Sequence, residues 1–267
     1  MSLEIVQVDA FTSSPFRGNP AAVCVLNDPA SDTWMQAVAA EMNLSETAFL
    51  RRRGGGFSIR YFTPRVEVPL CGHATLASAH VLWEAGEVPP SETIRFHTRD
   101  SALFASREAS RVCLDFPSFP VVPIAVPVQL PGVLGTSVMG AYRGDTDWLL
   151  VELEDESTLR ALRPDLGRLE ADGYGCIAVT AACGSGAFDF VSRCFAPGEG
   201  IPEDPVTGSA HCCLGPFWAG RLGRTDLTGY QASSRGGTVH VRVRGSRVDL
   251  LGQAVTVMRS QLMVDPN

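Results

Sequence analysis

Two carboxylates occupy unusual local settings in this chain. Glu46 lies in the segment "NLSETAFL", between the end of a predicted helix and an apolar strand. Asp204 precedes Pro205, and proline restricts the residue before it to extended conformations, so the Asp204 carboxylate is predicted to have a fixed direction. A carboxylate partly buried against apolar side chains can transfer protons near neutral pH. A turn motif or a solvent-facing charge is the alternative for Glu46, and Glu203, beside Asp204, is interpreted as a solvated neighbour.

Two predicted helices begin with glycine and small residues, one near Gly72 in "LCGHATLASA" and one near Gly208 in "PVTGSAH". The first turn of a helix has unpaired N–H groups and the positive end of the helix dipole. Glycine there allows a ligand to approach the backbone closely. Two such helix starts could bind an anion, for which a substrate carboxylate is the natural candidate. Simple capping of the second helix by Thr207 or Ser209 is the alternative.

Several other kinds of chemistry are excluded or disfavoured. All 22 basic residues are arginines, so neither a Schiff-base lysine nor a P-loop lysine is available. His73 and His211 lie at the two helix starts without a third ligand at suitable spacing, so we predict no metal. The segment "CGSG" (183–186) lies between two strand-like runs and is predicted to be a hairpin turn. The cysteines form no C-x-x-C pair and match no zinc signature; most are interpreted as reduced, buried small residues: Cys24, Cys71, Cys113, Cys176, Cys183, Cys194, Cys212 and Cys213.

Composition narrows the class of protein further. The chain has 267 residues, 45% of them hydrophobic and 19% charged, with a net charge of −7. The negative charge disfavours nucleic acid as a partner. No apolar run approaches 18 residues, and the first residues lack the pattern of a secretory signal. We therefore expect a cytoplasmic protein with no membrane partner. The basic run at 51–53 is predicted to be the solvated end of a hairpin.

The same arrangement of elements is predicted in both halves of the chain. Strands are predicted at 3–10, 21–26, 57–63, 93–97, 102–107 and 111–116, then at 136–143, 147–153, 175–182, 187–195, 238–244 and 247–252. Helices are predicted after an N-cap at Ser31, from Gly72 to Gly86, near 156–162 and from Gly208. Residues 116–127 contain four prolines and are interpreted as a linker.

These elements predict an α+β protein with two like domains and a cleft between them. Each half has many strands and one apolar helix that is entered through glycine. We place the first domain at 1–116 and the second at 117–257, with 258–267 able to pack back on the first.

Four segments together resemble the PhzF family of phenazine-biosynthesis isomerase-like proteins. They are "VDAFTSSPFRGNPAAV" (8–23), "NLSETAFL" (43–50), "LCGHATLASA" (70–79) and "FAPGEGIPEDPVTGSAH" (195–211). Their order and spacing fit the family over essentially the whole chain. The resemblance implies two domains that each fold a mostly antiparallel, curled sheet around a central helix, as in diaminopimelate epimerase. It also implies isomerisation without a cofactor, and commonly a homodimer.

The resemblance also implies roles for particular residues. Glu46 would be the general acid/base that removes a proton from carbon and returns it elsewhere. Asp204 would assist proton movement or orient the substrate, and His73 would hydrogen-bond near the reacting centre. The substrate carboxylate would be held at Gly72, Gly208 and Ser209.

Cys71 leaves a second enzyme class open. It resembles the position of a base thiol in related amino-acid epimerases and racemases, which use two cysteines on opposite faces of the substrate carbon. The second motif has no thiol at the matching place, and Cys212 and Cys213 come too late in their helix. Cys71 is therefore interpreted as a buried small residue, with a helix-start thiolate of lowered pKa as the alternative. The leading prediction is an isomerase that acts on a small carboxylate-bearing metabolite. An epimerase or racemase that uses Cys71 and a non-catalytic metabolite-binding protein are the alternatives.

Overall fold

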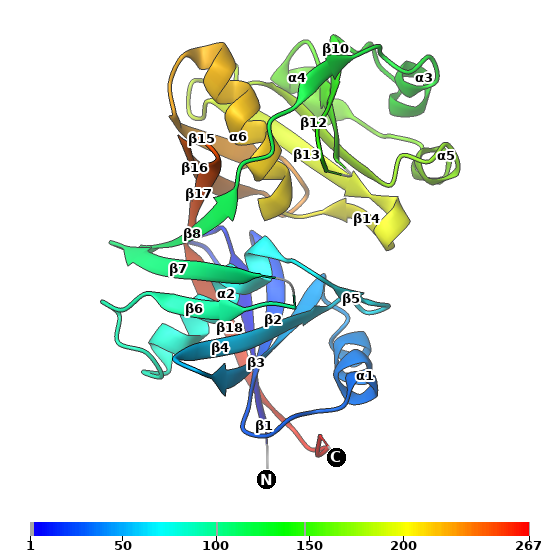
Figure 1. Ribbon diagram of the computed structural model, residues 1–267. Coiled ribbons are helices and arrows are strands. Elements are labelled where there is room, and N and C mark those ends of the chain that lie inside the picture. The colour runs from blue at the N-terminus through cyan, green and yellow to red at the C-terminus, as the bar shows by residue number, and fades with distance from the viewer. Residues whose placement is uncertain (1–2, 100, 147, 267) are drawn as a thin grey trace. The chain divides into compact units, whose positions relative to one another are not determined.

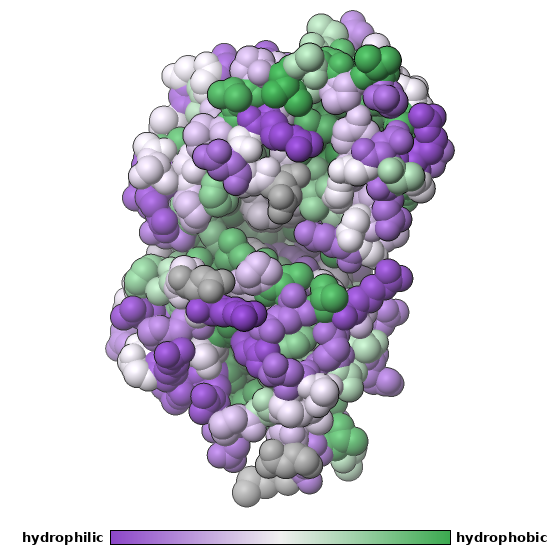
Figure 2. Space-filling model, turned by 45° about the vertical axis from the view of Figure 1, so that its right-hand side comes forward, coloured by the Kyte–Doolittle hydropathy of each residue, from purple (hydrophilic) through white to green (hydrophobic). Residues whose placement is uncertain are grey.

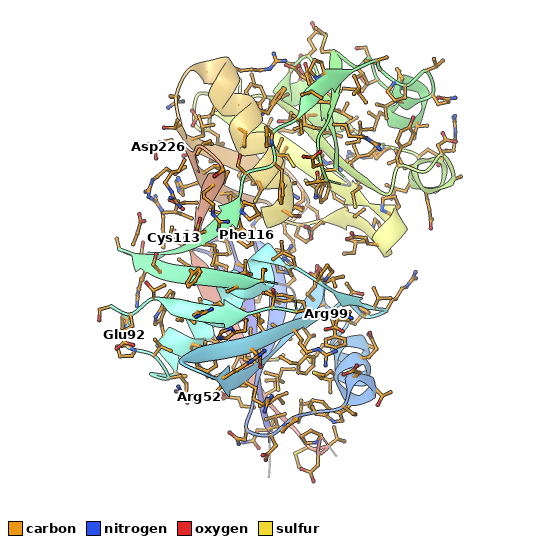
Figure 3. The ribbon with its side chains drawn as sticks, in the orientation of Figure 1. Arg52, Glu92, Arg99, Cys113, Phe116 and Asp226 are labelled. Atoms are coloured by element: carbon orange, nitrogen blue, oxygen red, sulfur yellow. The ribbon has the colours of Figure 1, made fainter. Side chains whose placement is uncertain are left out.

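A computed structural model describes residues 3–99, 101–146 and 148–266 of the chain (Figure 1). The chain forms two compact units: unit 1 comprises Met1–Asp115 and Leu251–Asn267, and unit 2 comprises Phe116–Leu250. Phe116, the first residue of unit 2, is labelled in Figure 3. Each unit combines a curled β-sheet with few helices, which is the predicted α+β class.

Unit 1 is built on a mixed sheet in which antiparallel pairs predominate. Its strands are β1 (Leu3–Ala10), β2 (Asn19–Leu26), β3 (Glu46–Arg53), β4 (Gly56–Phe62), β5 (Glu67–Val68), β6 (Ile94–His97), β7 (Ala102–Glu108), β8 (Arg111–Pro117) and β18 (Ala254–Leu262). Strand β2 pairs with β3 in parallel, and β4 pairs with β6 in parallel. The other pairs are antiparallel: β1 with β18 and β2, β4 with β3 and β5, and β7 with β6 and β8.

The helix α2 (Gly72–Glu84) is the central helix of unit 1, and eleven of its residues are buried. Its small residues, among them Ala74, Ala77 and Ala79, allow the strands to approach on several sides. A helix that is apolar all round is typical of such a buried position. The helix packs against β1, β2 and β3. The other helix, α1 (Asp32–Met42), has Ser31 as its N-cap, whose hydroxyl accepts from the Trp34 N–H, as predicted.

Unit 2 repeats this plan with a different order of elements. Its strands are β9 (Val122–Ile124), β10 (Gly140–Arg143), β11 (Trp148–Glu152), β12 (Cys176–Ala182), β13 (Phe190–Ala196), β14 (Ile201–Asp204), β15 (Asp226–Gln231), β16 (Gly237–Arg244) and β17 (Arg247–Gly252). The last two residues of β17 belong to unit 1. Antiparallel pairs join β9 to β10, β12 to β13, β13 to β14 and β15 to β16. Strand β11 pairs with β12 in parallel, and β13 pairs with β15 in parallel.

The helix α6 (Gly208–Leu222) is the central helix of unit 2 and packs against β11, β15 and β16. Three short helices cover other parts of this unit: α3 (Leu130–Leu134), α4 (Glu156–Ala161) and α5 (Leu166–Ala171). Residues 183–186 connect the antiparallel strands β12 and β13, which confirms the predicted hairpin connection there.

Two boundaries differ from the predictions. The proline-rich segment 116–127 contains β9, which pairs with β10, so it is part of the sheet of unit 2 as well as a connection. Residues 251–257, assigned to the second domain from sequence, belong to unit 1 because β18 pairs with β1 from Ala254 onward. The strand predicted at 147–153 is observed as β11, and residue 147 lies outside the described residues.

The surfaces of both units mix hydrophilic and hydrophobic residues, as Figure 2 shows for one face. Arg51–Arg53 end β3 next to a turn at Gly54 and Gly55, which confirms the predicted hairpin end. The Arg52 guanidinium, labelled in Figure 3, pairs with Glu87 at 2.7 Å. Among the described residues, no helix has the length and apolar character needed to cross a membrane.

Candidate active site

Glu46 is the first residue of β3 and lies in the interior of unit 1. It pairs in register with Ala21 of β2, and the four residues after it are buried. Only 8% of Glu46 is exposed. The predicted position between a helix end and an apolar strand is therefore confirmed, and the alternative of a solvent-facing charge is wrong. A carboxylate buried to this degree needs polar neighbours.

His73, the second residue of α2, is the nearest ionisable neighbour of Glu46. Its Nε2 lies 3.1 Å from the Glu46 Oε2, and His73 is 3% exposed. At this distance the two atoms are nevertheless not aligned as a hydrogen bond. Catalytic hydrogen bonds are often poorly aligned before substrate binds and tighten in the complex. The pair thus combines two groups that general acid/base catalysis commonly uses.

The other imidazole nitrogen of His73 faces two further groups. The Asn19 amide nitrogen lies 3.1 Å from Nδ1, and the Cys71 Sγ lies 3.4 Å from it. An amide nitrogen can only donate, so in the neutral imidazole this contact favours the proton on Nε2, the nitrogen that faces Glu46.

The charges of this cluster depend on one another. Burial opposes the charged form of His73, but Cys71 and Glu46 outweigh it and raise the pKa of His73 well above its usual value. Burial, and then the charge of Glu46, raise the pKa of the Cys71 thiol to about 11. The thiol is therefore protonated near neutral pH, which contradicts the alternative of a helix-start thiolate with a lowered pKa.

Glu46, Cys71 and His73 offer ligand atoms within 4.8 Å of one another, a donor set that a transition metal could use. However, the carboxylate contacts Nε2 of the imidazole and the thiol contacts Nδ1. The structure thus brings two further potential ligands to His73, which the spacing in the sequence did not indicate, and the predicted absence of a metal stays a prediction.

Asn19 is the residue of this site that the sequence reasoning missed. It begins β2 and is fully buried. Gly18 before it has a φ of +64°, and a Cβ there would lie 2.1 Å from the Ala10 carbonyl oxygen, so only glycine allows this approach. The signal was present as "GNP" within segment 8–23, but nothing in one sequence shows that Asn19 reaches His73.

The first turn of α2 is held by a buried chain of hydrogen bonds. The Thr75 hydroxyl donates to the Cys71 carbonyl at 2.6 Å, and the Tyr61 hydroxyl lies 2.6 Å from the Thr75 hydroxyl. Burial raises the pKa of Tyr61, so its hydroxyl stays protonated. Cys71 is the N-cap residue but makes no side-chain cap. The chain fixes the backbone that carries Gly72 and His73.

The second predicted carboxylate, Asp204, ends β14 in unit 2 and is 8% exposed. The Thr207 hydroxyl lies 2.5 Å from its Oδ2. Thr207 is the N-cap residue of α6, but its side chain makes no cap hydrogen bond because it is engaged by Asp204. Capping by the Thr207 side chain is therefore wrong. Gly208 is buried, and Ser209, one residue further, is partly exposed.

Glu203 has a structural role and is not a solvated neighbour. Its two carboxylate oxygens accept from Nε and Nη2 of Arg193 at 2.7 and 2.8 Å. Arg193 is 8% exposed and also donates to the Leu162 carbonyl at 2.8 Å. A paired, two-pronged contact of this kind is geometrically specific. The two adjacent acids thus have different tasks, and the sequence assigned only that of Asp204.

His211 is fully buried, and its Nδ1 lies 2.8 Å from the Thr207 carbonyl oxygen. Burial lowers the pKa of His211 to about 4. It is a neutral structural histidine in unit 2, unlike His73. The predicted site residues therefore form two groups: Glu46, Cys71, Gly72 and His73 in unit 1, and Asp204, Gly208 and Ser209 in unit 2.

The curled sheet around a central helix in each unit defines an epimerase-like fold class. A probable proline racemase from Agrobacterium radiobacter has the same fold, with a TM-score of 0.67 over 99% of this chain and 94% of that chain, at 12% identity.

The chain belongs to the PhzC-PhzF family, described as phenazine biosynthesis-like protein, whose model matches residues 8–260. It is 49% identical to an uncharacterized isomerase of Halalkalibacterium halodurans over 99% of this chain and 100% of that protein. A crystal structure of a PhzF-family protein from Enterococcus faecalis matches 99% of this chain and 100% of that chain, with a TM-score of 0.94 and 40% identity. These relatives support an isomerase- or epimerase-like function.

Proposed function

We propose that this protein is a cofactor-independent isomerase that moves a proton, and with it a double bond, within a small carboxylate-bearing metabolite. One observation carries the proposal: the Glu46 carboxylate and the His73 imidazole are buried together at 3.1 Å, at the start of the central helix of unit 1. A carboxylate that is kept from bulk water and has an ionisable neighbour suits general acid/base catalysis.

In the proposed reaction Glu46 takes a proton from one carbon of the substrate. The electrons of that C–H bond form a new double bond, and the existing double bond shifts. Glu46 then returns the proton to a different carbon, so the substrate is isomerised without net change in atoms or electrons. His73 beside it stabilises the charged carboxylate before the transfer and hydrogen-bonds near the reacting atoms.

The helix starts support the binding part of the proposal. Neither Cys71 nor Thr207 caps its helix with a side chain. The backbone N–H groups in the first turn of each helix are therefore not occupied by the side chain of the N-cap residue. We propose that Gly72, Gly208 and Ser209 hold the substrate carboxylate, and that Asp204 orients the substrate or assists the proton.

The test begins with the small acids that co-purify with the protein, identified by mass spectrometry. Each is incubated with the protein in heavy water, and deuterium incorporation at carbon is followed by NMR. We expect exchange with the wild type and a loss of about 10²- to 10⁴-fold in Glu46→Gln, the usual range for a general acid/base. Glu87→Gln, which removes an exposed carboxylate paired with Arg52, is the control. Wild-type exchange in Glu46→Gln would show that the general-base role is wrong.

The same experiment separates the two alternatives. An epimerase that depends on Cys71 would lose exchange in Cys71→Ala and keep it in Glu46→Gln. A non-catalytic binding protein of the same fold would retain a bound acid but show no exchange at carbon with any variant or at any pH.

A further inference from the structure

Gln231, the last residue of β15, occupies a position where the strand pattern calls for an apolar side chain. Alternate residues of this strand face the interior, namely Leu227, Gly229 and Gln231, and Gln231 is completely buried. A buried amide lowers stability unless its donors and acceptors are satisfied. A glutamine in this place therefore needs specific partners.

Three of the four side-chain contacts of Gln231 lie at the turn before α6, and the fourth is to Cys194 of β13. Its Nε2 donates to the Asp204 carbonyl at 2.7 Å and lies 3.1 Å from the Thr207 hydroxyl oxygen. Its Oε1 accepts from the Thr207 N–H at 2.9 Å, and the Cys194 Sγ lies 3.6 Å from the same oxygen. The nitrogen and the oxygen of the Gln231 amide thus both bind groups of the turn that connects Asp204 to α6.

The orientation of this amide is fixed by its backbone partners. The Thr207 N–H can only donate, so the atom that faces it must be the amide oxygen. The Asp204 carbonyl can only accept, so the atom that faces it must be the amide nitrogen. Reversing the amide would place donor against donor and acceptor against acceptor at the same time.

This orientation decides where the hydroxyl proton of Thr207 points. The amide nitrogen of Gln231 supplies a proton to the Thr207 hydroxyl oxygen, so the hydroxyl must direct its own proton elsewhere. The Asp204 Oδ2 lies 2.5 Å away, and a carboxylate oxygen is a stronger acceptor than the Cys194 thiol, which also interacts with the Thr207 side chain. Asp204 consequently accepts a hydrogen bond from the Thr207 hydroxyl and does not donate one to it.

We propose that Gln231 is a positioning residue that fixes Thr207 as a hydrogen-bond donor and so holds Asp204 as an acceptor at the start of the reaction. This inference rests on the proposed function for the role of Asp204 in the reaction, but not for the direction of the hydrogen bonds. In this proposal Asp204 accepts a hydrogen bond from Thr207 and either orients the substrate or accepts a proton later in the reaction. Glu46 remains the group that first removes the proton from the substrate.

Neutron crystallography of the deuterated wild-type protein tests the direction itself and requires no substrate. We expect a deuterium on the Thr207 hydroxyl that points to Asp204 Oδ2, and amide deuterons of Gln231 that point to the Asp204 carbonyl and the Thr207 oxygen. A deuterium on Asp204 that points to Thr207 would overturn the inference.

Variants then test whether this direction matters for the reaction. Gln231→Met removes all four contacts at similar volume, and Gln231→Glu keeps the acceptor but loses both donors, so two carboxylates compete for one hydroxyl proton. We expect at least about tenfold lower kcat in each, the effect of losing a hydrogen bond to a charged group. The matched control is Gln36→Met, which removes a partly buried amide that donates to the Thr63 carbonyl at 2.8 Å in unit 1. We expect wild-type kcat for this control.

A double-mutant comparison distinguishes positioning from a general loss of stability. If Gln231 acts through Thr207 and Asp204, Gln231→Glu should lower kcat in the wild type but change it less than about twofold in Asp204→Asn. Equal effects in both backgrounds would assign Gln231 a structural role alone. Wild-type activity of Asp204→Asn itself would instead contradict the proposed role of Asp204, while the neutron result could still stand.

Discussion

The two central helices begin with the same local pattern but serve different surroundings. Helix α2 starts after Cys71 with Gly72, and α6 starts after Thr207 with Gly208. Both N-cap residues are extended, with φ and ψ of −144° and 114° for Cys71 and −107° and 101° for Thr207. Neither makes a side-chain cap. In both units, an extended N-cap residue without a side-chain cap is thus followed by a helix that begins with glycine.

The side chains around these two starts differ in kind. In unit 1 the residue after glycine is His73, which is buried against Glu46. In unit 2 it is Ser209, which is partly exposed, while the N-cap Thr207 is bound to Asp204 and Gln231. One helix start lies beside a buried carboxylate–imidazole pair, and the other presents a hydroxyl next to a carboxylate that is held by Thr207. The two helix starts therefore share a backbone pattern, and the side chains around each start determine which chemistry it can support.

The largest expected effect comes from comparing the two histidines at these helix starts. His73→Gln removes the ionisable neighbour of Glu46 and should lower the rate of deuterium exchange by about 10²-fold or more. His211→Gln removes a hydrogen bond to the Thr207 carbonyl, and should lower the rate by less than about tenfold. Exchange rates measured at saturating substrate test this, and equal losses in the two variants would contradict the division of tasks.

The same pair predicts opposite pH dependences of stability. His211 has a lowered pKa of about 4 in the folded protein, so the unfolded chain takes up a proton first as pH falls below about 6.5. Its contribution is full above that pH, and on the order of 3 kcal/mol is lost as pH falls towards 4. His73 has a raised pKa, so its contribution is present below about 6.5 and is lost as pH rises through the folded value.

Urea unfolding at pH 5 and pH 8 measures this contrast. The stability advantage of the wild type over His211→Gln should be larger at pH 8, and its advantage over His73→Gln larger at pH 5. The same sign of change for both variants would show that the two histidines do not differ in the way their surroundings imply.

Most strands and the glycine-containing starts of both central helices could be predicted from the sequence, because these features depend on residues close together in the chain. Alternating apolar residues predicted most strands, and the glycine-entered apolar segments predicted both central helices. The strands β5, β9, β14, β15 and β18 were missed. Of these, β5, β9 and β14 are short, β9 and β14 contain a proline, β15 contains a glycine, and β18 is partly exposed along its whole length. Its place in unit 1 depends on pairing with β1, more than 240 residues earlier in the chain.

The contacts that define the site were less accessible to sequence reasoning, because they join distant segments. Asn19 contacts His73 across 54 residues, and Gln231 contacts Thr207 across 24. Both are buried polar residues at a strand terminus. A single sequence does not show whether a polar residue in such a position is buried or exposed. Glu203 was misinterpreted for the same reason, since its partner Arg193 lies on a neighbouring strand.

A smaller effect is expected from the hydroxyl at the second helix start. Ser209→Ala should raise KM by about tenfold with little change in kcat, because a hydrogen bond to a bound carboxylate is lost while the proton-transfer pair in unit 1 is intact. Ser157→Ala is the matched control, since Ser157 occupies the same second position of α4 (Glu156–Ala161). A fall in kcat with unchanged KM would assign Ser209 to the chemical step instead of binding.

The smallest expected effect concerns Cys71, the residue that would make unit 1 the thiol half of an epimerase. Its thiol is protonated near neutral pH because its pKa is about 11, and its contact to His73 Nδ1 is shared with Asn19. Cys71→Ala should therefore change the exchange rate by less than about threefold, since the remaining Asn19 contact still orients the imidazole. Cys113→Ala, another buried cysteine of unit 1, is the control for lost volume. A loss of about 10³-fold in Cys71→Ala alone would assign the thiol a direct part in proton transfer. Cys71 and Thr207 are the N-cap residues of α2 and α6. Such a loss would therefore show that the N-cap position of α2 contributes a side chain to the reaction.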